Sequence, residues 1–178
     1  MILSLEQKLK KIKLIATDVD GVLTDGSFYI GSGKEMKRFH SNDGLAFVLL
    51  RLLKFPVAVI SGRFSEATIS RTRALNIPDD LVFQDSHIKT GAFETLKKRF
   101  DLEDHEIAYM GDDYIDTPIL KRCGVSFAPA NAITEIKEMV DHVTVIPGGS
   151  GAFREMVDMI LRAQGSFDEA LEKLHGLY

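Results

Sequence analysis

Short apolar runs alternate with amphipathic stretches along most of the chain. Runs without any charged residue occupy residues 14–17, 57–60, 81–83, 107–110, 125–128 and 143–146. Such runs are typical of strands buried on both faces of a sheet. Segments with helical periodicity separate them, at about residues 44–53, 65–75, 90–100, 115–122, 132–140 and 152–164. The alternation predicts an α/β fold: a Rossmann-like, doubly wound, mostly parallel sheet with helices on both faces.

Residues 26–40 depart from this alternation. Two β-prone runs flank the sequence Gly-Ser-Gly-Lys at residues 31–34, so a β-hairpin flap is expected after the first strand. A short helix before the first strand and a tail helix over residues 166–178 are also expected. Neither residues 20–61 nor residues 89–112 leave room for a separate cap domain, because domains usually need about 50 residues or more. We therefore predict a single domain over residues 1–178.

Composition and charge narrow the possible functions. Hydrophobic residues make up 45% of the chain and charged residues 27%, as in ordinary globular proteins. The net charge of −4 offers no basic surface to a phosphate backbone, so no nucleic-acid partner is expected. Residues 1–13 resemble neither a signal peptide nor a membrane span. Because Cys123 is the single cysteine, no internal disulfide can form, and we expect a cytoplasmic protein with no membrane partner.

Polar residues follow four of the predicted strands. They are Asp18 and Asp20 after the first strand, Ser61 after the second, Lys89 at the start of the helix after the third, and Asp112, Asp113 and Asp116 after the fourth. In a parallel sheet, ligands bind outside the carboxyl ends of the strands. These side chains are therefore expected to share one crevice.

The pair Asp18 and Asp20 is the most unusual feature, because like charges repel and aspartate is depleted in strands. Clustered carboxylates call for a cation, and an all-oxygen set suits Mg²⁺. Ser61 and Lys89 offer a hydrogen-bond donor and a positive charge to a phosphate. Gly21 turns the chain directly after Asp20. The pattern thus predicts that one aspartate attacks phosphorus while the other serves as acid and base.

In order and context, "DVDGVLTDG", Ser61, Lys89 and "GDDYID" resemble the four motifs of the haloacid dehalogenase superfamily of phosphotransferases. The hairpin and the late "GGSGAFRE" loop more narrowly resemble the capless phosphatases that act on 3-deoxy-2-ulosonic acid phosphates. The best-known substrate of that family is 3-deoxy-D-manno-octulosonate 8-phosphate, a precursor in lipopolysaccharide synthesis. The resemblance implies a Mg²⁺-dependent phosphomonoester hydrolase that works through an aspartyl-phosphate.

The resemblance also implies roles for the acidic residues. Asp18 would be the nucleophile and a metal ligand. Asp20 would be the acid and base, with its backbone carbonyl on the metal, and Asp112 would be the third ligand. Asp113 and Asp116 would support the ligands from behind. Ser61 and Lys89 would hold the phosphoryl group, with Lys89 also steadying Asp18.

Candidates for binding the substrate extend beyond the phosphoryl site. The full set is Asp20, Ser41, Asn42, Asp43, Gly44, Ser61, Gly62, Arg63, Arg71 and Lys89. The two arginines are included because guanidinium groups pair with a sugar carboxylate bidentately. The resemblance further implies a homotetramer in which hairpins associate and neighbouring subunits, including their C-terminal tails, border each active site.

Two alternatives stay open. Octulosonate phosphatases often carry arginines near the position of Asn42 and one turn into the following helix, where this chain has Val48 and Leu49. That departure leaves room for a nine-carbon, sialic-acid-like ulosonate 9-phosphate as substrate. A non-hydrolytic, phospho-accepting receiver domain is the alternative of another class, since it also combines an acidic Mg²⁺ pocket with a hydroxyl and a lysine.

Overall fold

The central feature of the fold is a six-stranded sheet with the strand order β5-β4-β1-β6-β7-β8. A computed structural model describes residues 3–177. The strands are β1 (Leu14–Thr17), β4 (Val57–Ile60), β5 (Val82–Phe83), β6 (Ile107–Met110), β7 (Val125–Ala128) and β8 (His142–Val143). All neighbouring strands pair in parallel, which confirms the predicted doubly wound sheet. The winding reverses between β1 and β6, the position at which such sheets bind ligands.

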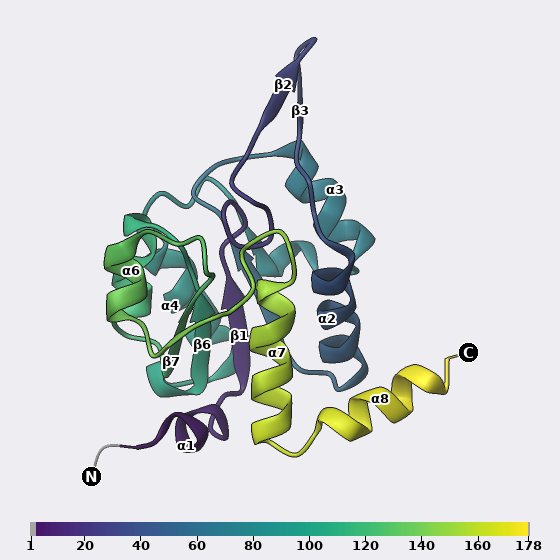
Figure 1. The fold of residues 1–178 in the computed structure, drawn as a ribbon, viewed down its shortest axis with the longest axis vertical. Coiled ribbons are helices and arrows are strands. Elements are labelled where there is room, and N and C mark those ends of the chain that lie inside the picture. The colour runs from purple at the N-terminus through teal and green to yellow at the C-terminus, as the bar shows by residue number, and fades with distance from the viewer. Residues whose placement is uncertain (1–2, 178) are drawn as a thin grey trace.

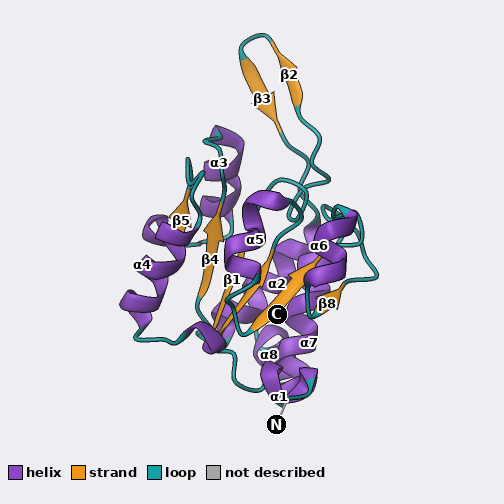
Figure 2. Ribbon diagram, turned by 90° about the vertical axis from the view of Figure 1, so that its left-hand side faces the viewer, coloured by secondary structure: helices purple, strands orange, loops and turns teal. Residues whose placement is uncertain are grey.

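Helices cover both faces of this sheet. Their bounds are α1 (Leu5–Leu9), α2 (Ser41–Leu52), α3 (Glu66–Ala74), α4 (Thr90–Phe100), α5 (Thr117–Leu120), α6 (Thr134–Met139), α7 (Ala152–Ala163) and α8 (Phe167–His175), with short 3₁₀ turns at η1 (Asp79–Leu81), η2 (Asp104–Glu106) and η3 (Tyr114–Asp116). Helices α2 and α7 pack together on one face, whereas α4 and α5 lie on the other (Figures 1 and 2). No additional folded unit interrupts the described residues.

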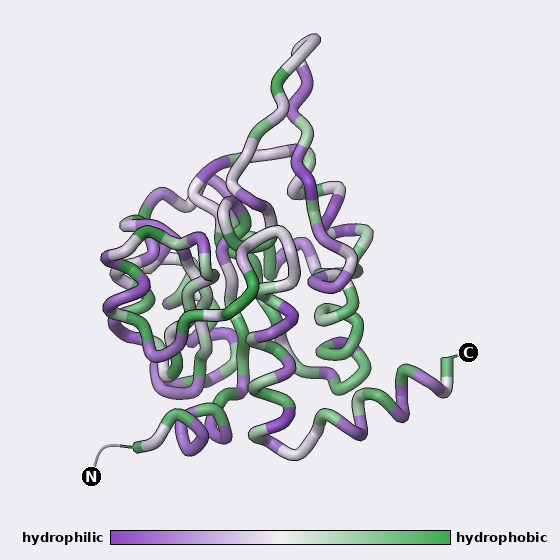
Figure 3. The backbone as a smooth tube through the Cα atoms, viewed as in Figure 1, coloured by the Kyte–Doolittle hydropathy of each residue, from purple (hydrophilic) through white to green (hydrophobic). Residues whose placement is uncertain are grey.

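The core forms between the central strands and the inner faces of the helices. Every residue of β1, β6 and β7 is buried. The stacked rings of Phe47 and Phe153, with centroids 4.5 Å apart, join α2 to α7. Figure 3 shows α2 as a largely apolar segment and α8 as an alternation of apolar and polar residues. Among residues 3–177, no helix combines the length and the apolar character needed to cross a bilayer.

The hairpin consists of β2 (Tyr29–Gly31) and β3 (Lys34–Met36), paired antiparallel. It projects from the body beyond α3 (Figure 1). Ser32 and Gly33 at its tip have φ angles of 51° and 71°, the left-handed conformation that two-residue hairpin turns require. The predicted flap is therefore present. The tail helix is present as α8, while Tyr178 lies outside the described residues.

Two predicted boundaries were wrong. The last strand covers His142–Val143 rather than 143–146, because the backbone N–H groups of Val145 and Ile146 donate to the Glu155 carboxylate instead of a neighbouring strand. The helix predicted over residues 65–75 is present as α3, capped by Ser65, whose hydroxyl accepts from the N–H of Thr68. The segment predicted as a helix over 115–122 divides into η3 and the four-residue α5.

Candidate active site

The carboxyl ends of β1 and β6 lie side by side, since Thr17 is paired with Met110. The next residue, Asp18, donates its backbone N–H to the carbonyl of Met110 at 3.0 Å. Above this point opens a cavity of about 280 Å³. Its lining residues are Asp18, Asp20, Phe28, Gly62, Arg63, His87, Asp112, Asp113 and Ile115. The point where the winding reverses therefore carries the predicted aspartates.

Asp18 is held by donors on both carboxylate oxygens. Its Oδ1 accepts from the backbone N–H of Val19 at 2.7 Å, and its Oδ2 lies 2.9 Å from Nζ of Lys89. The residue is almost fully buried. Burial raises the pKa of Asp18 to about 7, with the charge of Asp116 acting in the same direction and Lys89 opposing it. A buried, oriented carboxylate of this kind can serve as a nucleophile.

Lys89 is the central cation of the site. It immediately precedes α4 and is buried, and its Nζ lies between Oδ2 of Asp18 at 2.9 Å and Oδ1 of Asp116 at 2.7 Å. Burial alone would lower the pKa of Lys89, but the two carboxylates outweigh burial and raise it. Lys89 is therefore a fixed positive charge beside the candidate nucleophile.

Asp116 organises the loop that follows β6. Its Oδ1 accepts from Nζ of Lys89 and from the hydroxyl of Tyr109 at 2.6 Å. Its Oδ2 accepts from the backbone N–H groups of Asp112 at 3.1 Å and Asp113 at 3.3 Å. The side chain is fully buried. With both oxygens engaged, Asp116 fits the predicted supporting role, whereas Asp113 is exposed and its Oδ1 accepts from the N–H of Tyr114.

Asp112 has a carboxylate oxygen that is free to bind a ligand. Its Oδ1 is buried and has no hydrogen-bond donor among the described residues. Burial, followed by the charges of Asp18 and Asp116, raises the pKa of Asp112 to about 8. One carboxylate oxygen from each of these three aspartates lies within 4.8 Å of the others. This crowded oxygen set, with an orphaned buried acceptor, fits a hard divalent cation such as Mg²⁺.

The side chain of Asp20 lies outside the cluster of carboxylates. The carboxylate of Asp20 turns to Lys37, with Nζ at 2.7 Å from Oδ1 and 3.0 Å from Oδ2. Asp116 supplies the third carboxylate of the cluster, although both Asp116 oxygens already accept hydrogen bonds from protein groups. For Asp20 this leaves the backbone carbonyl, the ligand that the resemblance implies.

Glycines allow the close packing around these aspartates. Gly21 has a φ of +87°, and a Cβ atom there would lie 1.9 Å from Oδ2 of Asp112. The "PGGSG" loop over residues 147–151 has φ angles of +65° at Gly149 and +119° at Gly151. A Cβ on Gly148 would lie 1.8 Å from the carbonyl oxygen of Gly21. The loop thus supports the turn after β1 by backbone-to-backbone contact that side chains would prevent.

The loop after β4 forms the other wall of the cavity. Ser61 is buried, and its hydroxyl donates to the carbonyl of Arg63 at 3.0 Å. Gly62 and Arg63 line the cavity directly. The guanidinium of Arg63 donates to Glu35 at 2.8 Å and lies 4.2 Å from the ring centroid of Phe28. Of the predicted arginines, Arg63 is therefore the one that the single chain places at the cavity.

The remaining sugar-binding candidates gather elsewhere, around the start of α2. They are Ser41, Asn42, Asp43, Gly44 and Arg71, none of which lines the cavity over β1 and β6. Asp43 is buried and accepts from the backbone N–H of Arg154 at 3.0 Å; burial raises its pKa. Arg71 donates to the carbonyl of His40 at 3.2 Å. The prediction that they border the active site is not met within one chain.

Val48 and Leu49 are the apolar residues at which the sequence departs from octulosonate phosphatases. Leu49 is fully buried in the core and Val48 is half-buried. Both belong to α2, which packs against α7 and α8. The apolar character of Leu49 therefore serves core packing rather than contact with a sugar.

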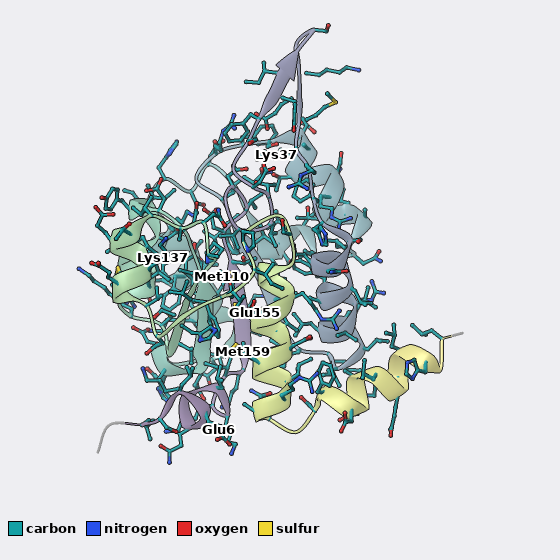
Figure 4. All side chains as sticks on the ribbon, in the orientation of Figure 1. Glu6, Lys37, Met110, Lys137, Glu155 and Met159 are labelled. Atoms are coloured by element: carbon teal, nitrogen blue, oxygen red, sulfur yellow. The ribbon has the colours of Figure 1, made fainter. Side chains whose placement is uncertain are left out.

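Several residues of the site were not predicted from the sequence. Phe28, His87 and Ile115 line the cavity, and Tyr109 donates to Asp116 with a pKa raised well above its usual value by burial. Lys37 contacts Asp20 from the foot of the hairpin, above the carboxyl edge of the sheet (Figure 4). The alternation of Glu35 and Lys37 along the second hairpin leg was the available signal, because residues two apart in a strand share a face.

Comparison with known proteins agrees with this site. A family model described as haloacid dehalogenase-like hydrolase matches residues 61–151. The chain is 45% identical over 170 residues to the 3-deoxy-D-manno-octulosonate 8-phosphate phosphatase KdsC of Haemophilus influenzae, covering 93% of each chain.

Two solved structures are similar over nearly the whole chain. The cobalt-bound form of the Haemophilus influenzae phosphatase superposes with a TM-score of 0.86 at 45% identity, covering 90% of this chain and 94% of that one. The 3-deoxy-D-manno-octulosonate 8-phosphate phosphatase of Moraxella catarrhalis, in complex with a magnesium ion, a phosphate ion and 3-deoxy-D-manno-octulosonate, superposes with a TM-score of 0.89 at 35% identity, covering 95% and 97%. The chain belongs to the haloacid dehalogenase-like hydrolases, in the capless family of 3-deoxy-D-manno-octulosonate 8-phosphate phosphatases.

Proposed function

We propose that this protein is a Mg²⁺-dependent phosphatase that hydrolyses 3-deoxy-D-manno-octulosonate 8-phosphate through an aspartyl-phosphate on Asp18. The observation that carries the proposal is the buried Asp18–Lys89–Asp116 arrangement beside the unsatisfied carboxylate of Asp112. It supplies an oriented nucleophile, a cation for the phosphoryl group and a place for a metal. The names of the relatives support the choice of sugar.

The first chemical step transfers the phosphoryl group to the protein. A carboxylate oxygen of Asp18 attacks phosphorus, and the bond between phosphorus and the sugar oxygen breaks. The protonated carboxyl of Asp20 donates its proton to the departing oxygen, so that the sugar leaves as an alcohol. Lys89 and Ser61 are the side chains we assign to the phosphoryl oxygens.

The second step restores the enzyme. Water attacks the phosphorus of the aspartyl-phosphate while the Asp20 carboxylate takes one of its protons. The bond between phosphorus and the Asp18 oxygen then breaks, which releases orthophosphate and the Asp18 carboxylate. Over both steps Asp20 gives one proton and regains one, and the net reaction consumes one water per phosphate released.

The carboxylates of Asp18 and Asp112 and the backbone carbonyl of Asp20 are the groups we assign to Mg²⁺. When bound, the ion neutralises charge on the carboxylates and on the transferring phosphoryl group. Arg63, at the mouth of the cavity, is the residue we assign to the sugar carboxylate, because a guanidinium pairs with that group bidentately.

We further propose that the active protein is a homotetramer whose neighbouring subunits border each site. The cavity is open, and water exclusion strengthens phosphoryl-transfer electrostatics. The hairpin exposes Tyr29, Ile30 and Met36, the second with 78% of its surface accessible, and such apolar groups suit subunit contact. Light scattering should give a mass near four chains. Cys123 is the single cysteine of the sequence and is partly buried; one cysteine cannot form an internal disulfide, which accords with a cytoplasmic location.

The deciding experiment measures phosphate release with Mg²⁺ over a panel of phosphates. The panel contains the octulosonate 8-phosphate, a nine-carbon ulosonate 9-phosphate, glucose 6-phosphate, phosphoglycolate and a nucleotide monophosphate. We expect the octulosonate ester to lead by about a hundredfold in kcat/KM. Faster hydrolysis of the nine-carbon ester would make that ester the substrate. Uniformly weak release would contradict the proposal of an ulosonate phosphate as substrate. Accumulation of aspartyl-phosphate without release would favour a receiver domain.

A further inference from the structure

Lys37 is a buried cation that the mechanism above does not use. It follows β3 at the foot of the hairpin, and its side chain is 0% exposed. Its Nζ lies 2.7 Å from Oδ1 and 3.0 Å from Oδ2 of Asp20, so one ammonium contacts both oxygens of the proposed acid and base. A buried ammonium is costly unless paired, and the carboxylate of Asp20 is its nearest partner.

The other groups that face Lys37 are more distant. Oγ1 of Thr68 lies at 3.4 Å, Oε1 of Glu35 at 3.8 Å and the ring centroid of Phe28 at 5.4 Å. These contacts come from α3 and from both legs of the hairpin, so the ammonium is enclosed on several sides. Its position is therefore set by the fold rather than by solvent.

Lys37 contacts Asp20 without lining the cavity itself. Asp20 lines the cavity over β1 and β6, and Lys37 does not. The side chain of Asp20 keeps 19% of its surface exposed while that of Lys37 has none. Asp20 is thus the cavity residue that Lys37 contacts most closely, with the Phe28 ring farther away at 5.4 Å.

The same hairpin leg is anchored at a second point. Glu35, two residues before Lys37, accepts from Arg63 at 2.8 Å and from the hydroxyl of Ser65 at 2.7 Å. Residues two apart on an extended leg point the same way, so both side chains face the body. The foot of the hairpin consequently ties the turn after β1 to the loop after β4.

We propose that Lys37 is a positioning residue that holds the carboxyl of Asp20 in the orientation needed for proton transfer. The inference rests on the proposed function, in which Asp20 protonates the departing sugar oxygen. A general acid must lie within hydrogen-bond reach of the oxygen it protonates, and a carboxyl on a turn would otherwise sample several rotamers. Lys37 keeps its own protons throughout, and Asp20 makes the transfers.

Substitution Lys37→Met tests this role, because methionine has a similar length and suits a buried site. We would measure kcat/KM for the octulosonate 8-phosphate and for p-nitrophenyl phosphate in the same preparation. The sugar alkoxide needs a proton to leave, whereas p-nitrophenolate does not. We expect a loss of about tenfold to a hundredfold with the sugar phosphate and less than about threefold with the aryl phosphate. The ratio of the two values does not depend on how much of the preparation is active.

Three comparisons complete the design. Lys34→Met, an exposed lysine on the same hairpin, should leave the ratio unchanged. Lys37→Gln retains a donor to Asp20 and should show a smaller loss of the same kind, which keeps the test available if Lys37→Met does not fold. Adding Lys37→Met to Asp20→Asn should lower kcat/KM for the sugar phosphate by less than about twofold further, since residues acting through one another are not additive.

Equal losses with both substrates, or full additivity with Asp20→Asn, would overturn the positioning role and leave Lys37 as a structural residue. Failure of the wild-type protein to hydrolyse either phosphate would instead reject the proposed function. The two failures are therefore distinguished by the wild-type measurement.

Discussion

Nζ of Lys89 lies 2.9 Å from Oδ2 of Asp18, with both side chains at least 95% buried. A buried charge is costly unless it is paired, and Lys89 pairs with Asp18 and also with Asp116 at 2.7 Å. The contact fixes one carboxylate oxygen while the Val19 N–H fixes the second. The candidate nucleophile is therefore oriented before any substrate arrives, and an oriented group reacts faster than a freely rotating one.

Asp18→Asn should abolish turnover and leave the fold intact. An amide cannot form the aspartyl-phosphate, while it retains the size of the carboxyl and relieves the repulsion with Asp116 that helps to raise the pKa of Asp18. Phosphate release should fall to the level of buffer, and the melting temperature should equal or exceed that of the wild type. Appreciable residual release from a folded variant would contradict the mechanism.

Lys89→Met should lower the free energy of unfolding by about 3–5 kcal/mol, because it leaves the buried carboxylates of Asp18 and Asp116 without their cation. Urea unfolding measures this change. Lys10→Met is the matched control: the pair of Lys10 with Glu6 is more than half exposed, so its loss should change stability by about 0.5 kcal/mol or less. Equal effects from the two variants would refute the buried network.

Stability should depend on pH and Mg²⁺ together. Without metal, burial raises the pKa of Asp18 to about 7 and that of Asp112 to about 8, against about 4 in an unfolded chain. Between about pH 4 and 8 the folded state therefore binds more protons, and the free energy of unfolding falls as pH rises.

Magnesium should oppose this loss, since it takes the place of the protons between the carboxylates. Thermal melts from pH 5 to 8.5, with and without millimolar Mg²⁺, should show a stabilisation that grows with pH. Asp112→Asn should weaken both the pH dependence and the effect of Mg²⁺. A melting temperature unaffected by Mg²⁺ at pH 8 would argue against the metal site.

Arg63→Met should separate recognition of the sugar acid from phosphate chemistry. Because Arg63 lines the cavity and a bidentate pair with a carboxylate is among the stronger charge-assisted contacts, its loss should raise KM for the octulosonate ester by about tenfold or more. KM for glucose 6-phosphate, which has no carboxylate, should change little. Equal changes for both substrates would assign Arg63 to the phosphoryl group or to Glu35 alone.

Much of the fold and the centre of the site could be predicted because their signals are local. Each central strand is an uninterrupted apolar run, and a parallel sheet brings the ends of such strands to one edge. Asp18, Lys89 and Asp112 each follow a strand or open a helix at a boundary visible in the sequence. The alternation predicts the parallel sheet, while the strand order that sets β1 beside β6 comes from the structure.

Contacts made by the hairpin could not be predicted in the same way. The alternation of Glu35 and Lys37 puts their side chains on one face of the hairpin leg, but nothing local in the sequence indicates that this face turns toward Asp20. The same holds for Arg71, which looked as suitable for a sugar acid as Arg63 but donates to His40 instead. Only the packing of the loops over the sheet decides which charge reaches the cavity.

The motif "GDDYID" shows the division most plainly. The sequence alone determined that carboxylates follow β6, since the motif itself gives their number and positions. Which of Asp113 and Asp116 turns inward was decided by tertiary structure. Asp113 precedes η3 in extended backbone and its exposed carboxylate accepts from the N–H of Tyr114, whereas Asp116 at the end of η3 is buried and contacts Lys89. The buried carboxylate of Asp116 accepts hydrogen bonds from Lys89 and Tyr109. These contacts exist only in the packed molecule, because the three residues come from separate segments of the chain.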